Sequence, residues 1–477
     1  MMAAATNDPN RTISAIGAAT RRFIDSQEAI RELADFALQE ARTLDSEEAS
    51  AAHLATLVMG SGVDPRVSER VYQIAQTNVH AQRSAVAEGH KKERQALREG
   101  AAAEDGRKVF RDYAEETIAG LIQGMRVSLA NLGIHDLRTQ FRINQFVLVQ
   151  IRRPRVPILM QSLLTTAVSE FESFISATAH QSYNYRPHAL RDSGSQYSWA
   201  DVSEFETIDE FTHYAIDSQV DSLMRQGLDD WLKFFAKVTR APLEELTPIA
   251  EPIQEVLQRR HVITHNGGRV SRQYLANTKG DKQPKKLGKL LQVDLEYLES
   301  ALNNFTVLSL FISQAAASAV AKSTKSEDLG ADADLALGEI VLDMLKLGRF
   351  GCVARLMPAL EKYLNSAGSV ETLRVNSWIA RSRVEGAESI RAEVEQWDDS
   401  SLNETFQLAK SVLLERYDGA SRQARHLVKT DQLTSYAMET WPLFEPLREY
   451  QSRQTASLAK KTTPAKTAAR APSPPRS

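Results

Sequence analysis

The chain has 477 residues, long enough for two or three domains, and its 42% hydrophobic and 25% charged residues predict a sizeable globular core. A net charge of −3 excludes a global basic field for nucleic acid, so any such binding must come from a local patch. The single cysteine, Cys352, excludes a disulfide framework and a cysteine-rich zinc module. No segment resembles a secretory signal or a membrane span, so we expect a cytoplasmic protein without membrane partners.

The amino-terminal third is predicted to be mainly helical. We expect residues 1–11 to be disordered and residues 12–157 to form helices, because amphipathic spacing recurs along them. Asp64 and Pro65 suit the N-cap and first position of one of these helices. The segment 139–157 alternates apolar and polar residues, which predicts a short strand.

A second block, residues 158–321, is predicted to be a helical domain that ends in a buried helix. A polar linker at 322–334 separates it from a third block, 335–450. In that block alanines recur at intervals of 33 residues, a period typical of tetratricopeptide-like helix pairs, although short helices also recur near this length by chance. The basic, proline-containing tail at 451–477 is predicted to be disordered, and the whole fold to be mainly α.

The densest polar cluster of the chain is "QRRHVITHNGG", residues 258–268. It lies at the end of a predicted helix that runs from about Pro248 to His265, and Asn266-Gly267-Gly268 suits a helix C-cap. At 100° per residue, Arg260 falls in the middle of the apolar stripe of this helix, whereas His261 and His265 share the neighbouring face.

An arginine in an apolar stripe needs a carboxylate partner or an anion, because an unpaired buried guanidinium is very costly. Glu170 and Glu172, in "SEFESF", are both candidate partners, and both also suit ordinary helix-surface charges. Arg259 next to it is explained by the favourable position of a cation at a helix C-terminus.

This residue set suits RNA cleavage without a cofactor. Histidine titrates near neutral pH, so His265 can move protons, with His261 and Asn266 as further polar groups and Arg260 to stabilise charge on the phosphorane. Two histidines four residues apart also suit a shared metal, but no third ligand is evident and we expect none. A basic loop downstream suits either an RNA backbone or plain solvation, with lysines at Lys279, Lys282, Lys285, Lys286 and Lys289.

The stretch "RRHVITHNGGRVSRQYL", with the early "FESF" helix, resembles the HEPN superfamily of all-helical domains. Ribonucleases of that family carry Arg, a polar residue, three more residues and His, which here corresponds to Arg260, His261 and His265. The resemblance covers about residues 158–321. In the subgroup neutralised by nucleotidylation a Tyr lies two residues after the His, where this chain has Gly267, which puts that mode of control in doubt.

The resemblance implies an up-and-down helical bundle that dimerises, so that two copies of the motif face a shared RNA cleft. It also implies a metal-independent endoribonuclease with a role as a toxin or in phage defence. The alternatives are a catalytically inactive module that binds RNA or protein, and a nucleotide-binding regulator. For the third block we expect a protein partner, since helical arrays offer extended binding surfaces.

Overall fold

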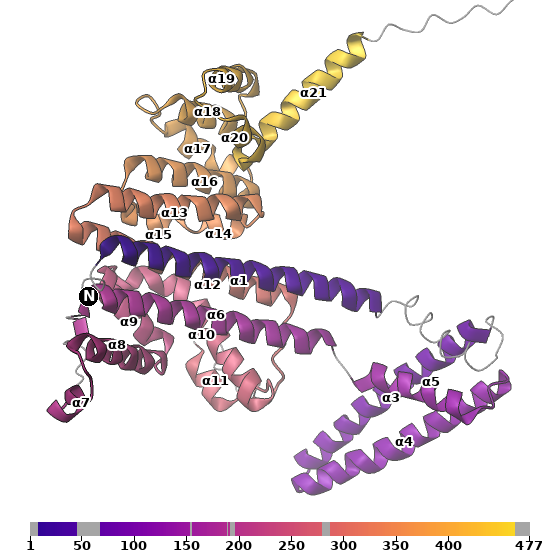
Figure 1. Cartoon of the computed structure of the whole chain (residues 1–477). Helices are drawn as coiled ribbons and strands as arrows, with labels where there is room; N and C mark the ends of the chain where they lie inside the picture. Colours follow the sequence, from indigo (N-terminus) through magenta and orange to yellow (C-terminus); the bar gives the residue numbers. More distant parts are fainter. Residues whose placement is uncertain are drawn as a thin grey trace, which may run out of the picture. The chain divides into compact units, whose positions relative to one another are not determined.

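The computed structural model describes residues 8–44, 67–152, 155–187, 189–190, 196–278 and 287–462. Over these residues the chain is helical, and the only β-pairing is one isolated bridge between Arg269 and Leu290. The mainly-α fold class is therefore confirmed. The chain forms two compact units (Figure 1), the larger from Met1–Ala29, Leu164–Leu291 and Glu296–Ser477, the smaller from Ile30–Leu163 and Gln292–Leu295.

The smaller unit contains α3 (Ser68–Arg98), α4 (Ala103–Asn131) and α5 (Leu137–Arg152). The predicted strand at 139–157 is wrong, because α5 covers most of that segment. Ile143, Phe146 and Val147 are all buried against α3 and α4, and their spacing fits one face of a helix. Asp136 caps the helix by accepting a hydrogen bond from the backbone N–H of Thr139 (2.8 Å). Tertiary burial thus outweighs the local alternation of apolar and polar residues.

The larger unit is built around α12 (Leu295–Thr324), which lies beside α1 (Pro9–Leu44) and α6 (Arg155–Tyr185). Phe171 of α6 stacks on Phe305 of α12 with ring centroids 4.6 Å apart, and Phe23 of α1 lies 6.0 Å from Phe171. The apolar run 305–320 is a buried helix, as predicted. By length and hydropathy α12 resembles a membrane span, but 94% of its most apolar 18-residue segment is buried inside the structure.

The predicted linker at 322–334 is wrong. Helix α12 continues to Thr324, and after only two intervening residues α13 (Glu327–Lys346) begins, with Ser326 as its N-cap. Glu327, Asp328 and Asp332, which suggested a linker, lie on the exposed side of α13, whereas Leu329 and Ala333 pack against α12 and α1 and Asp334 is buried. The third block therefore belongs to the same compact unit as the second.

The amino-terminal region is also divided differently from the prediction. The first part of α1 belongs to the larger unit, where Thr20 and Ser313 share a hydrogen bond (2.6 Å) and Arg349 donates two hydrogen bonds to Glu28. Two ends predicted to be disordered are partly helical, because α1 begins at Pro9 and α21 ends at Thr462. The rest of both segments, except Asp8, lies outside the described residues.

Asp334 connects the second and third blocks. Its buried carboxylate accepts hydrogen bonds from the side chain of Gln314 (2.7 Å) and from the backbone N–H groups of Asn365 (2.7 Å) and Ser366 (2.9 Å). Asn365 also approaches Gly330 so closely that a Cβ there would lie 2.6 Å from the Cβ of Asn365. These contacts join α12, α13 and the turn before α16 (Ala367–Glu385).

The carboxy-terminal helices pack on one another through buried aromatic side chains. Trp378 and Trp397 are buried and meet edge to face at 5.1 Å, and the indole N–H of Trp441 donates to Asn376 (3.1 Å). The alanines spaced 33 residues apart lie at different positions, with Ala354 ending α14, Ala387 capping α17 and Ala420 inside α19. The further helices of this block are α14 (Phe350–Ala354), α15 (Met357–Leu360), α17 (Glu388–Gln396), α18 (Glu404–Leu413), α19 (Tyr417–Lys429), α20 (Ser435–Thr440) and α21 (Glu445–Thr462).

Candidate functional site

The site residues lie on and around α10 (Leu243–Asn266), which starts earlier than predicted and contains two prolines. Gly267 ends the helix in the left-handed conformation (φ 56°, ψ 32°), and the N–H of Gly268 donates to the carbonyl of Val262 (3.1 Å). The predicted C-cap is therefore confirmed. The other helices of this region are α7 (Trp199–Ser203), α8 (Ile208–Met224), α9 (Leu228–Thr239) and α11 (Arg272–Asn277).

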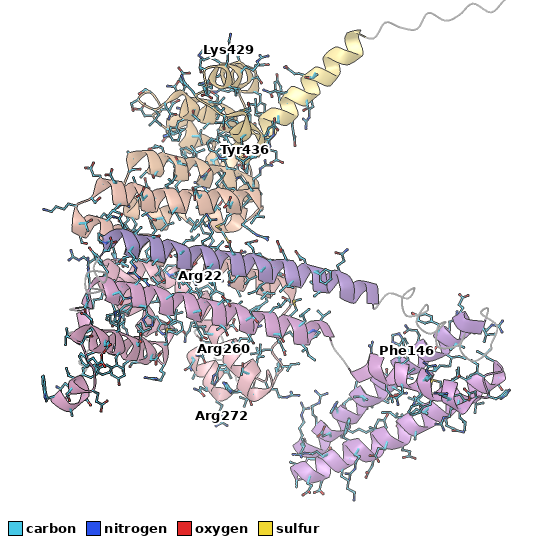
Figure 2. The ribbon with its side chains drawn as sticks, in the orientation of Figure 1. Arg22, Phe146, Arg260, Arg272, Lys429 and Tyr436 are labelled. Atoms are coloured by element: carbon cyan, nitrogen blue, oxygen red, sulfur yellow. The ribbon has the colours of Figure 1, made fainter. Side chains whose placement is uncertain are left out.

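Arg260 pairs with Glu172 of α6, through Nη2 of the guanidinium and Oε1 of the carboxylate. Figure 2 labels Arg260 where α10 lies next to α6. The flanking Phe171 and Phe174 are buried, so the helix holds Glu172 at the edge of the core beside α10. Glu170 forms no hydrogen bond or ion pair with any described residue, which decides between the two candidates in favour of Glu172.

The Arg260–Glu172 ion pair leaves one polar atom of Arg260 without a hydrogen-bond partner among the described residues. Both side chains are partly buried (25% and 30% exposed), and burial raises the pKa of Glu172, although Arg260 opposes that shift. The Nε of Arg260 is buried and has no hydrogen-bond partner among the described residues. The guanidinium is thus fixed on one side by Glu172, and a quarter of the side chain stays exposed to solvent.

His261 and His265 lie together on the exposed face of α10, with ring centroids 4.7 Å apart. Asn266 was predicted to be a polar group of the catalytic site. In the structure its side-chain N–H donates to the carbonyl of Arg269 (2.6 Å) and holds the turn after the helix. Two exposed histidines and one partly exposed arginine therefore share the last two turns of α10. Across the described ranges, no group of three or more His, Cys, Asp or Glu residues is arranged to hold a metal ion.

Most of the predicted basic loop falls outside the described residues, namely Lys279, Lys282, Lys285 and Lys286. Lys289 is described and exposed, and its carbonyl accepts a hydrogen bond from the N–H of Val270 (2.9 Å). The N–H of Leu291 donates to the carbonyl of Gly268 (2.8 Å). These bonds fix the segment after the loop next to the end of α10.

A second polar cluster, which the sequence did not predict, is centred on Glu255 of α10. Its carboxylate accepts hydrogen bonds from the Tyr274 hydroxyl (2.5 Å), the Tyr297 hydroxyl (2.6 Å) and Nε of Arg259 (2.9 Å). The guanidinium of Arg259 also lies 3.8 Å from the ring centroid of Tyr297. The only sequence signal was the four-residue spacing of Glu255 and Arg259, because the tyrosines come from α11 and α12. The cluster ties these two helices to α10.

We expect this cluster to lower stability at alkaline pH. Burial, together with Glu255, raises the pKa values of Tyr274 and Tyr297 above the ordinary 10.0. A raised folded-state pKa contributes stability below the ordinary value, and this contribution is lost as pH rises beyond it. The free energy of unfolding should therefore fall between pH about 8 and about 11.

Denaturant titrations at both pH values will measure this decrease in the intact chain and in Tyr297→Phe. The decrease should be smaller in Tyr297→Phe. Tyr436→Phe is the control, because Tyr436 is 71% exposed and lies on α20 (Figure 2). An equal decrease in the intact chain and in Tyr297→Phe would contradict the assignment.

No family model, curated protein or solved structure matches this chain.

Proposed function

We propose that this protein is a metal-independent endoribonuclease of the HEPN type, acting as a toxin or in phage defence. The observation that supports this proposal is the position of Arg260, which is partly buried and paired with a carboxylate. Its guanidinium is held by Glu172 with a quarter of the side chain still exposed, and it lies five residues before His265 on the same helix. A positively charged planar donor next to a proton-transferring side chain is what phosphodiester cleavage requires.

In the proposed reaction a histidine removes the proton from a ribose 2′-hydroxyl. The 2′-oxygen attacks the adjacent phosphorus, and the 5′-oxygen of the next nucleotide leaves after receiving a proton from a second histidine. Arg260 stabilises the negative charge of the phosphorane. The products are a 2′,3′-cyclic phosphate and a free 5′-hydroxyl, so no metal or other cofactor takes part.

A two-fold homodimer of the larger unit would supply His265 twice, once as base and once as acid. His261, beside it on the exposed face, is then a binding group for the RNA. The basic loop adds affinity without sequence preference, and the carboxy-terminal helices recruit a protein partner in the cytoplasm. Light scattering at assay concentration tests the dimer, and a monomer that retains full activity would refute it.

The second candidate function is a catalytically inactive module that binds RNA or protein. It is favoured by Asn266, because one of the two N–H donors of its side chain is used in the turn after the helix and only one is left for a phosphate. A nucleotide-binding regulator is a weaker alternative, which predicts stabilisation by nucleotides.

Incubation of the purified chain with total RNA in excess chelator separates these functions. The proposal predicts cleavage that persists in chelator and gives 2′,3′-cyclic phosphate or 3′-phosphate ends. Binding without cleavage would favour the inactive module, and cleavage that requires a divalent metal would overturn the mechanism.

A further inference from the structure

A cavity of about 320 Å³ lies between α9, α10 and the end of α11. Its floor is apolar and is formed by the buried side chains of Leu228, Leu232 and Ala250. Polar groups from α9, α10 and α11 stand around it, among them Asp229, Glu251, Gln254 and Asn277. Small-ligand sites typically combine about 300–1,000 Å³ with apolar walls and a few convergent polar groups, so this cavity has the size for one small planar group.

The cavity lies on the same face of α10 as the two histidines. Residues 254, 258, 261 and 265 fall on one stripe at 100° per residue, and Gln254 lines the cavity. The amide of Asn277, at the far wall, donates to Gln258 (3.2 Å), the next residue of the stripe. With a rise of about 1.5 Å per residue, Gln254 lies about 16 Å along the helix from His265. That separation corresponds to a few nucleotides of single-stranded RNA.

The charges of the cavity select among ligands. Glu255 already accepts hydrogen bonds from two tyrosines and Arg259, and Lys233 donates to Asp230 (2.9 Å). Neither side chain is therefore the main group available to bind a ligand. The carboxylate of Glu251 is exposed and forms no hydrogen bond or ion pair with other described residues, whereas the exposed carboxylate of Asp229 interacts electrostatically with Lys233. A phosphate would be repelled here, whereas a ring that carries N–H donors would be attracted.

We propose that this cavity binds a guanine base of the RNA, at a fixed position a few nucleotides from the bond that is cleaved. Guanine has two adjacent donors, N1–H and the N2 amino group, which match the two oxygens of a carboxylate. Glu251 accepts them, Gln254 and Asn277 supply further polar contacts, and the ring lies on the apolar floor. The inference rests on the proposed function for the identity of the ligand as RNA, but the binding itself does not depend on cleavage.

The test measures binding separately from catalysis. Single-stranded hexanucleotides that contain one guanine, or adenine, cytosine or uracil at that position, are titrated against the full chain carrying His265→Ala, with fluorescence anisotropy as the readout. We expect about tenfold tighter binding of the guanine oligonucleotide, the usual worth of a bidentate base contact. Adding Glu251→Gln should remove this preference, whereas Glu439→Gln, an exposed carboxylate on α20, should leave it unchanged.

Equal affinities for all four oligonucleotides, or a guanine preference that survives Glu251→Gln, would overturn the inference. Weaker binding of every oligonucleotide in Glu251→Gln would equally overturn it, because the residue would then not read the base. Cleavage by the intact chain without guanine dependence would refute the pocket and keep the ribonuclease. Guanine-dependent binding by a chain that never cleaves RNA would refute the ribonuclease and keep the pocket.

Discussion

His265→Ala should slow RNA cleavage by about 10²- to 10⁴-fold, the usual contribution of a positioned acid or base. The side chain is exposed in the last turn of α10, so its removal should leave the free energy of unfolding nearly unchanged. Gel assays in chelator measure the cleavage rate, and denaturant titration measures stability. His426→Ala is the matched control, since His426 is also an exposed histidine in the last turn of a helix, α19.

Arg260→Ala should also abolish most cleavage, by about 10²- to 10³-fold, because one donor to a developing oxyanion is lost. Unlike His265→Ala, it should also lower stability, since the half-buried Glu172 loses its partner. The double variant Arg260→Ala with Glu172→Gln removes that unpaired charge. It should regain stability and remain inactive, which separates chemistry from folding.

Two outcomes would contradict the catalytic roles of His265 and Arg260. Full activity of either single variant would remove that residue from the reaction. Recovery of cleavage in the Arg260→Ala, Glu172→Gln double variant would show that Arg260 acts only through the fold.

A chain that ends after Ala321 should fail to fold. The cut removes α13, whose Leu329 and Ala333 cover α12 and Ile13 of α1, and it leaves the buried Gln314 without Asp334. Large apolar areas of α12 would meet water, at a cost of about 25 cal/mol per Å². Circular dichroism and thermal unfolding of the shortened chain measure the loss.

A point variant tests the same contact in the full chain. Asp334→Ala should lower the free energy of unfolding by about 1–3 kcal/mol or more, because the donors of Gln314 and Asn365 lose their acceptor. Asp332→Ala is the control, as Asp332 is exposed on the same helix. A cooperatively folded chain ending at Ala321, with unchanged stability of Asp334→Ala, would show that the third block is separate after all.

The sequence alone predicted the helical class, the buried helix at 305–320 and the end of α10 at Gly267, because each depends on local signals. Helical periodicity, a continuous apolar run and an Asn-Gly-Gly C-cap act over a few residues and need no distant partner. The need for a carboxylate opposite Arg260 also followed from the sequence, since its place in an apolar stripe demands one.

Only the tertiary structure decided the contacts between distant segments. It chose Glu172 over Glu170, because buried phenylalanines on both sides fix the rotation of α6, and it gathered Tyr274 and Tyr297 around Glu255. It also made 139–157 mostly helical and removed the linker at 322–334, because in both segments long-range burial of one helix face outweighs the local pattern. Burial against a partner far along the chain has no local signature, which is why these features escaped the sequence.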